Sequence, residues 1–297
     1  MSIPPPSPNQ AYCHVSALDA GAVKTPLAWI LDGASDDAFI DVPALAFLVR
    51  HTAKPDLFLF DLGIRRDFAT ALPPHTIKYL SEQLRFDIKV PQDVVEALAK
   101  GDTKPSDITH ILISHLHFDH TGDASLFANA QVLSGEGARP LIEDGWPKNP
   151  SSAISQETLP EGRTTFLDPE GWPALGPFPH ALDFYGDGSL YIVDAGPGHL
   201  PGHLNVLVRT SADGGWIYLA GDSAHEWSII HGTGKIGHHP IFGCAHRDVA
   251  ATEAHIGRIR TLMRENSRVR VLLAHDAPWY AENRDGKAFW PGEIESL

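Results

Sequence analysis

The sequence predicts an α/β protein whose β-sheets are covered on at least one face by helices. Strand-like and helical segments alternate along the 297 residues, which is typical of one α/β domain. The strand-like runs are mostly apolar and do not alternate with polar residues, as expected for covered sheets. No change in composition marks a linker, and 43% hydrophobic residues can form a large core. We therefore expect a single domain over residues 1–297.

The apolar runs predict eight strands, at residues 44–50, 56–61, 108–114, 130–133, 190–194, 204–210, 216–220 and 269–274. The turn-forming sequence HTAKP separates the first two, which predicts a hairpin. A helix is expected at 91–101, where proline lies near the start and glycine at the end. The longest amphipathic pattern predicts a helix at 247–266, in which His255 is expected to be an ordinary residue and not a ligand.

Three segments lack a regular pattern. Residues 1–10 are rich in proline and are expected to form a loose tail. Residues 134–190 are rich in proline and glycine but contain large apolar side chains, so we expect an ordered binding loop or lid there. The segment HGTGKIGHH, 231–239, could be a further metal site, but we favour a mobile loop over the pocket.

The charge balance disfavours some classes of binding partner. With 23 basic and 37 acidic residues, the net charge of −14 disfavours nucleic acid and anionic membranes as partners. Neither a secretory signal nor a run of ~18 apolar residues is visible, so we expect a soluble, cytoplasmic protein. The two cysteines, Cys13 and Cys244, form no disulfide framework. A small molecule is the expected partner, and the oligomeric state is open, with a homodimer as one option.

The segment ISHLHFDHTGD, 113–123, predicts a metal site. His115 and His117 alternate at the end of a strand and can reach one metal ion from the same side. Asp119 and His120 lie where the chain turns and can reach a second ion. Imidazole nitrogens and carboxylate oxygens bind zinc at about 2.0–2.2 Å, and two-metal sites place their ions roughly 3.5–4 Å apart. The alternative, a solvated polar turn, leaves this concentration of ligands at a buried strand end unexplained.

Further candidate ligands follow later strands. His199 and His203 occur in GPGHLPGH, Asp222 follows the apolar run WIYLA, and His275 follows VRVLL. Loops at strand ends are where α/β proteins gather the residues of a site.

This order of motifs resembles the metallo-β-lactamase superfamily over about residues 40–280. The resemblance implies an αββα sandwich, in which two mixed sheets face each other, helices lie outside and the site occupies one edge. The segment FLFDLG, 58–63, is similar to an early element of the family. In that element Asp61 would support the metal ligands and Gly63 would allow the turn.

The resemblance also implies roles for the candidate ligands. His115, His117 and His203 would bind the first metal; Asp119, His120 and His275 would bind the second; Asp222 would bridge both. His199 is expected to order the loop or support a ligand. The cofactors would be two divalent ions, with Zn²⁺ the first choice and Mn, Fe or Co also open.

The closest resemblance within the family is to the quorum-quenching acyl-homoserine lactone lactonases. It implies a dinuclear hydrolase in which a hydroxide held between the metals attacks a carbonyl carbon and Asp119 shuttles the proton. Those lactonases commonly carry tyrosine three residues after the bridging aspartate, whereas this chain has His225. His225 could donate a hydrogen bond or a proton to the substrate, or lie in the loop without contact.

We therefore expect an enzyme that opens a lactone or a related cyclic ester or amide. Two alternatives use the same metal site: a lactamase-type hydrolase of a cyclic amide or carbamate, and a thioesterase for acyl or polyketide thioesters. A non-catalytic metal-binding protein is disfavoured, because every ligand position of the motif is filled.

Overall fold

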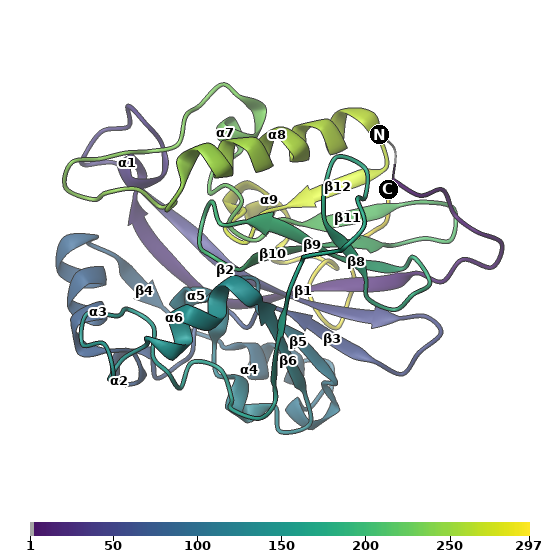
Figure 1. The fold of residues 1–297 in the computed structure, drawn as a ribbon, viewed down its shortest axis with the longest axis horizontal. Coiled ribbons are helices and arrows are strands. Elements are labelled where there is room, and N and C mark those ends of the chain that lie inside the picture. Colours follow the sequence, from purple (N-terminus) through teal and green to yellow (C-terminus); the bar gives the residue numbers. More distant parts are fainter. Residues whose placement is uncertain (1–2) are drawn as a thin grey trace.

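Two β-sheets face each other, and helices cover their outer sides (Figure 1). The computed structural model describes residues 3–297. The first sheet has seven strands in the order β4-β1-β2-β3-β5-β6-β7, and the second has five in the order β12-β11-β10-β9-β8. Both sheets mix parallel and antiparallel pairs. The predicted αββα sandwich is confirmed.

The first sheet is built around a long antiparallel pair, β1 with β2, in which Val23 lies opposite Val42. Strands β3, β5, β6 and β7 continue the sheet in parallel. The bounds of its strands are β1 Cys13–Pro26, β2 Phe39–His51, β3 Leu57–Phe60, β4 Asp87–Lys89, β5 His110–Leu112, β6 Gln131–Gly135 and β7 Thr164–Leu167.

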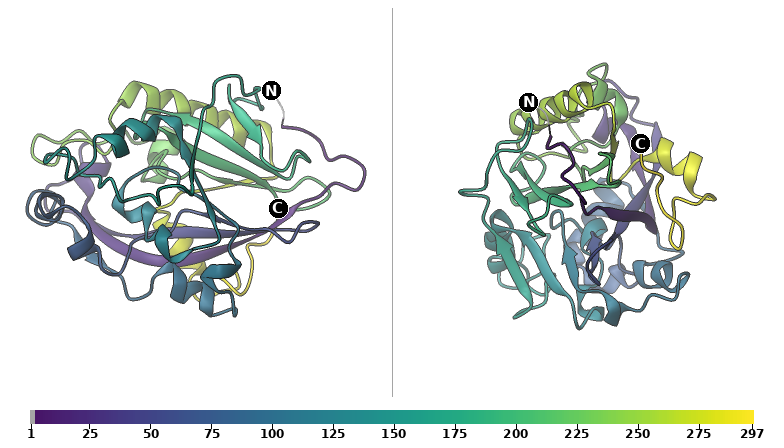
Figure 2. Two further views of the ribbon diagram at one scale, coloured as in Figure 1. Left: turned by 60° about the horizontal axis from the view of Figure 1, so that its bottom comes forward. Right: turned by 90° about the vertical axis from the view of Figure 1, so that its right-hand side faces the viewer.

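The second sheet comes from the later part of the chain. All seven residues of its central strand β10 are buried, because the first sheet covers one face and the helix α8 covers the other (Figure 2). This double coverage explains why the apolar runs do not alternate. The bounds are β8 Ala181–Asp183, β9 Leu190–Gly196, β10 His203–Arg209, β11 Trp216–Leu219 and β12 Val269–Leu272.

The helices are short except for α8. It begins after Asp248, whose side chain accepts a hydrogen bond from the backbone N–H of Ala251. The bounds are α1 Leu27–Ile30, α2 Phe68–Ala71, α3 Pro74–Lys78, the π-helix η1 Tyr79–Gln83, α4 Val94–Ala99, α5 Phe118–Thr121, α6 Arg139–Glu143, α7 Trp227–His231, α8 Val249–Glu265 and α9 Ala277–Asn283. Short 3₁₀ turns lie at Pro105–Asp107, Ala124–Leu126 and Glu136–Ala138. Within residues 3–297, none of the helices combines the length and apolar character that a membrane crossing requires.

All eight predicted strands and both predicted helices are present. The longest strand, β1, is missing from the prediction because it is rich in small residues and its register shifts between Asp19 and Ala22. The segment 134–190 supplies α6, β7 and β8, and its Phe178 is fully buried. The segment thus contributes a strand to each sheet, and its Ala153 and Ile154 line a cavity. At the other end of the chain, the expected tail has a buried residue, Ile3, although residues 3–10 form no helix or strand.

Candidate metal centre

The candidate ligands lie at one edge of the sandwich, in loops, in the short helix α5 and at the start of β10. The chain leaves β5, passes through Ser114, and enters α5, whose N-terminal cap is His117. This short path carries all four ligand-type residues of the first motif. The remaining candidates come from the loop between β9 and β10, from the turn after β11 and from the turn after β12. As expected, strand ends that are distant in sequence come together here.

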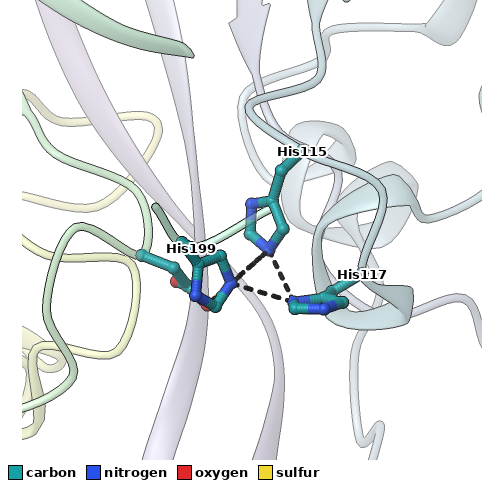
Figure 3. Close-up of side chains that lie close together, drawn as sticks. His115, His117 and His199 are labelled. Atoms are coloured by element: carbon teal, nitrogen blue, oxygen red, sulfur yellow. Dashed lines mark hydrogen bonds and ion pairs between the residues drawn. The ribbon is translucent and has the colours of Figure 1, made fainter. Parts of the chain in front are cut away.

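Three histidines form the first cluster, of which His115 and His199 are buried and His117 is half-buried (Figure 3). Nε2 of His115 lies 2.9 Å from Nδ1 of His117, and Nε2 of His199 lies 3.0 Å and 2.9 Å from these two atoms. Burial lowers the pKa of His117 to about 4 and the pKa values of His115 and His199 well below the usual value. The rings are therefore neutral and carry lone pairs. Three imidazole nitrogens that converge in this way suit a shared cation better than hydrogen bonds to one another.

Asp119, His120 and His275 form the second cluster, beside Asp222. Oδ1 of Asp222 lies 3.3 Å from Nε2 of His120 and 3.4 Å from Nε2 of His275. Among the described residues, neither Nε2 of His120 nor Oδ1 of Asp222 has a hydrogen-bond partner, although both atoms are buried. Such atoms are costly unless something else binds them. The donor set and these unpaired atoms fit a divalent ion.

The charges around this cluster favour a cation. Burial opposes protonation of His120, but the carboxylates of Asp222 and Asp61 outweigh it and hold the pKa of His120 well above its usual value. Burial likewise opposes a charge on Asp222, yet the surrounding imidazoles hold its pKa well below the usual range. The centre therefore stabilises positive charge between its carboxylates. Nitrogen and oxygen ligands of this kind suit Zn²⁺, Mn²⁺, Fe²⁺ or Co²⁺.

Two hydrogen bonds orient the histidines of the second cluster. Nδ1 of His120 donates to Oδ2 of Asp61 over 2.8 Å, and Nδ1 of His275 donates to the carbonyl of Pro43 over 2.7 Å. Each bond turns the Nε2 atom toward the cluster. Asp61 is fully buried and also accepts from the backbone N–H of Ser114 over 2.7 Å, which ties β3 to the first motif. Asp61 thus lies where the resemblance implies.

Gly63 makes the turn after Asp61 possible. Its φ is +64°, and a Cβ atom at this position would lie 2.2 Å from Cβ of Ala20. A side chain is excluded both by the left-handed backbone and by the close approach of β1.

His199 and His203 both lie near the first cluster, but only His199 is grouped with its ligand atoms. His199 lies in the loop before β10 and joins the first cluster, whereas His203 belongs to none of the metal-type groups within residues 3–297. His203 is the first residue of β10, and its Nε2 lies 3.3 Å from Nδ2 of Asn205 on the same face of the strand. His203 still lies beside the cluster, because its ring centroid is 5.2 Å from that of His115 and 5.6 Å from that of His199.

The family model of the metallo-beta-lactamase superfamily matches residues 40–275. The chain belongs to the metallo-β-lactamase superfamily. The gamma-lactamase FDB1 of Fusarium pseudograminearum (strain CS3096) is 36% identical over 63% of this chain and 46% of its own length. The metallo-hydrolase mfmC of Annulohypoxylon moriforme is 33% identical over 76% of this chain and 62% of its own length. The chain thus spans less than two thirds of either relative.

A crystal structure of a mutant of AiiA from B. thuringiensis, with N-decanoyl-L-homoserine bound at the active site, shares the fold. Its TM-score is 0.72, with 99% of this chain and 100% of that chain covered. The sequence identity is 16%, so this similarity concerns the fold alone.

His225 lies beside the candidate metal ligands. Its Nε2 is 3.1 Å from Oδ2 of Asp222, and its ring stacks on that of His275 with 5.7 Å between centroids. Together these three residues form a further group of ligand type. The turn after β11 therefore places His225 at the site, where it could contact a substrate or the metals.

The sequence contains no motif that marks His246 as part of the site. It is buried, and its Nδ1 lies 3.3 Å from Nδ1 of His199. His246 therefore supports His199 of the first cluster. It lies in an irregular segment before α8, so no local pattern could have identified it.

A cavity of about 210 Å³ opens directly onto both clusters. The residues of the site that line it are His117, Asp119, His199, Asp222, His225 and His275. Residues 231–239, expected to lie over the pocket, do not line it, but Cys244, a few positions later, does. Within residues 3–297, no metal-type group includes 231–239.

Proposed function

We propose that the protein is a two-metal hydrolase that opens a lactone or a small cyclic amide. The observation that carries this proposal is the position of Asp222, whose carboxylate faces both clusters. Its Oδ2 lies 3.2 Å from Nε2 of His199, and its Oδ1 lies 3.4 Å from Nε2 of His275. A carboxylate with one oxygen toward each cluster is suited to bridge two ions.

The geometry supports a ligand set that differs from the sequence prediction at one position. One ion would be held by His115, His117 and His199, and the other by Asp119, His120 and His275. Asp222 would be shared by both ions, of which Zn²⁺ is the first choice.

Divalent ions in such a site polarise a carbonyl group and lower the pKa of water to about 7, so that a nucleophile is available at neutral pH. The chain supplies the proton transfers. The Asp119 carboxylate lines the cavity and is only slightly exposed, so it is placed to accept a proton and return it to the leaving group. His225 lines the same cavity and can donate a hydrogen bond to the carbonyl oxygen or to the leaving group.

Ring opening is supported by both kinds of comparison. One relative is named a gamma-lactamase, and the structure with the shared fold holds a homoserine derivative. Hydrolysis adds one water molecule across the C–O or C–N bond of the ring and leaves an acid together with an alcohol or an amine. No observation favours the thioesterase alternative. A small-molecule partner and a cytoplasmic location remain predictions.

A hydrolysis screen tests the proposed function. Metal-loaded enzyme is incubated with five- and six-membered lactones, lactams and acyl thioesters, and product formation is followed. We expect ring opening by the native protein and its loss in Asp119→Ala, with the circular-dichroism spectrum unchanged. Asp285→Asn, at an exposed position outside the site, is the control and should keep full activity. Exclusive thioester cleavage, or full activity in Asp119→Ala, would overturn the proposal.

A further inference from the structure

The cavity beside the metal centre has an aromatic wall. Trp29, in α1, contacts the His225 ring edge-on at 5.6 Å between centroids and the Phe86 ring at 5.3 Å. Trp29 therefore spans from the metal centre to the apolar part of the cavity. Edge-to-face contacts hold its ring in place, so the cavity presents a preformed flat surface.

The floor of the cavity is the face of the β1–β2 pair. Val23 and Thr25 are two residues apart on β1 and share this face, and Val42 lies opposite Val23 on β2. Valine and threonine are nearly the same size, but threonine adds a hydroxyl group to an otherwise apolar surface.

That hydroxyl group has no partner in the protein. Thr25 is 1% exposed, and its Oγ1 atom forms no hydrogen bond with any of the residues 3–297. A buried hydroxyl group without a partner destabilises a folded protein. Because Thr25 lines the cavity, a polar atom of a ligand can satisfy it.

The cavity is also small. Its volume of about 210 Å³ lies below the roughly 300–1,000 Å³ that is usual for sites that enclose drug-sized ligands. A compact ring system suits this space better than a long, flexible acyl chain.

We infer that the substrate is a compact lactone or cyclic amide that carries, or is fused to, a flat apolar ring with one hydrogen-bonding substituent. The flat ring packs against Trp29 and Phe86, and the substituent bonds to Thr25. This inference rests on the proposed hydrolysis and adds the selection of the substrate. Trp29 and Thr25 determine specificity, whereas the reacting carbonyl lies at the metal centre.

A matched panel of substrates tests the inferred substrate preference. The panel contains an aryl-fused five-membered lactone and lactam, the same two compounds with a ring hydroxyl group, and N-decanoyl homoserine lactone. For metal-loaded native enzyme we expect kcat/KM to be at least tenfold higher for the hydroxylated aryl-fused compounds than for the long-chain lactone. Equal or better turnover of the long-chain lactone overturns the inference but leaves the proposed function intact. Failure to open any ring overturns both.

Variants at Trp29 test the wall. For the aryl-fused substrates, Trp29→Ala should raise KM about tenfold with a smaller effect on kcat, and Trp29→Phe should recover most of the loss. The control is Trp172→Ala, which removes a half-buried tryptophan that does not line the cavity. Metal content is measured for each variant. Unchanged KM in Trp29→Ala, or an equal change in Trp172→Ala, overturns the role of Trp29.

Thr25→Val separates a binding role from a structural one. It should abolish the preference for hydroxylated over unsubstituted substrates by lowering kcat/KM for the hydroxylated compounds. Because it removes an unpaired buried hydroxyl group, it should also raise the Tm of the substrate-free enzyme by roughly 2–4 °C. A lower Tm together with an equal loss for both substrate types shows that Thr25 is merely structural, and overturns its role in recognition.

Discussion

Nε2 of His199 lies 2.9 Å from Nδ1 of His117, although the two residues are 82 positions apart in the chain. The contact joins the loop before β10 to the start of α5. It completes a group of three neutral imidazoles, beside which His203, four residues after His199, contacts Asn205.

The proposed ligand role of His199 predicts different effects of the two histidines on metal binding. His199→Ala should reduce the metal content from about two ions per chain to about one, with only a small change in Tm. His203→Ala should keep both ions but lower the free energy of unfolding by about 1–3 kcal/mol, because a buried hydrogen bond is lost. Elemental analysis and thermal melts of the purified variants check this. The reverse pattern of metal loss would restore the assignment predicted from the sequence.

Asp61 is expected to matter for metal affinity, although it is not one of the proposed ligands. In Asp61→Asn the side chain keeps its size, but His120 loses its charged acceptor. Replacing partners of this kind typically costs 10–100-fold in metal affinity, and we expect a loss of about that size for one of the two ions. Competition with a chelator measures it. The exposed Asp37→Asn serves as the control, and equal affinities in the two variants would contradict the orienting role of Asp61.

The two cysteines are predicted to differ in reactivity. Burial raises the pKa of Cys13 to about 12, so its thiol stays protonated and inaccessible. Cys244 is half-buried and lines the cavity. Iodoacetamide at pH 8 should therefore label Cys244 and lower the activity, and Cys244→Ala should resist the reagent. Peptide mass spectrometry locates the label. Modification of Cys13 in the folded protein would count against the buried environment of β1.

His255 predicts part of the pH dependence of stability. Burial lowers its pKa to about 3, whereas in the unfolded chain it titrates near the ordinary value of about 6.5. Between these values the unfolded state binds one more proton, so the free energy of unfolding rises with pH, by up to about 1.4 kcal/mol per unit. Stability is therefore lost as the pH falls from about 6.5 toward 3.

His255→Gln removes the titrating group and should flatten this slope. Urea unfolding at several pH values measures the difference from the native protein. His238→Gln, at an exposed position, should keep the native slope. Parallel slopes in the native protein and His255→Gln would show that His255 does not titrate as its burial implies.

The sequence predicts those strands whose burial produces a recognisable apolar pattern. Strands covered on both faces, such as β10, appear as continuous apolar runs. The strand β1 has no such pattern, because small residues and a shift in register interrupt it. Its position follows from pairing with β2, which is a long-range interaction.

The residues of the site, too, are predictable from the sequence only in part. His115, His117, Asp119 and His120 are close in sequence, so their spacing already suggests a metal site. The choice between His199 and His203 depends on where β10 begins. His246, Trp29 and Thr25 carry no motif, because their relation to the centre arises only when distant segments pack together.

The central claim is that two ions held by the two clusters are needed for hydrolysis. Its most direct test is to strip the protein with a chelator, add Zn²⁺ stepwise, and record both the bound metal and the rate of ring opening. We expect no activity without metal and a rise to a plateau at two ions per chain. Full activity in the metal-free protein, or a plateau at one ion, would contradict the claim.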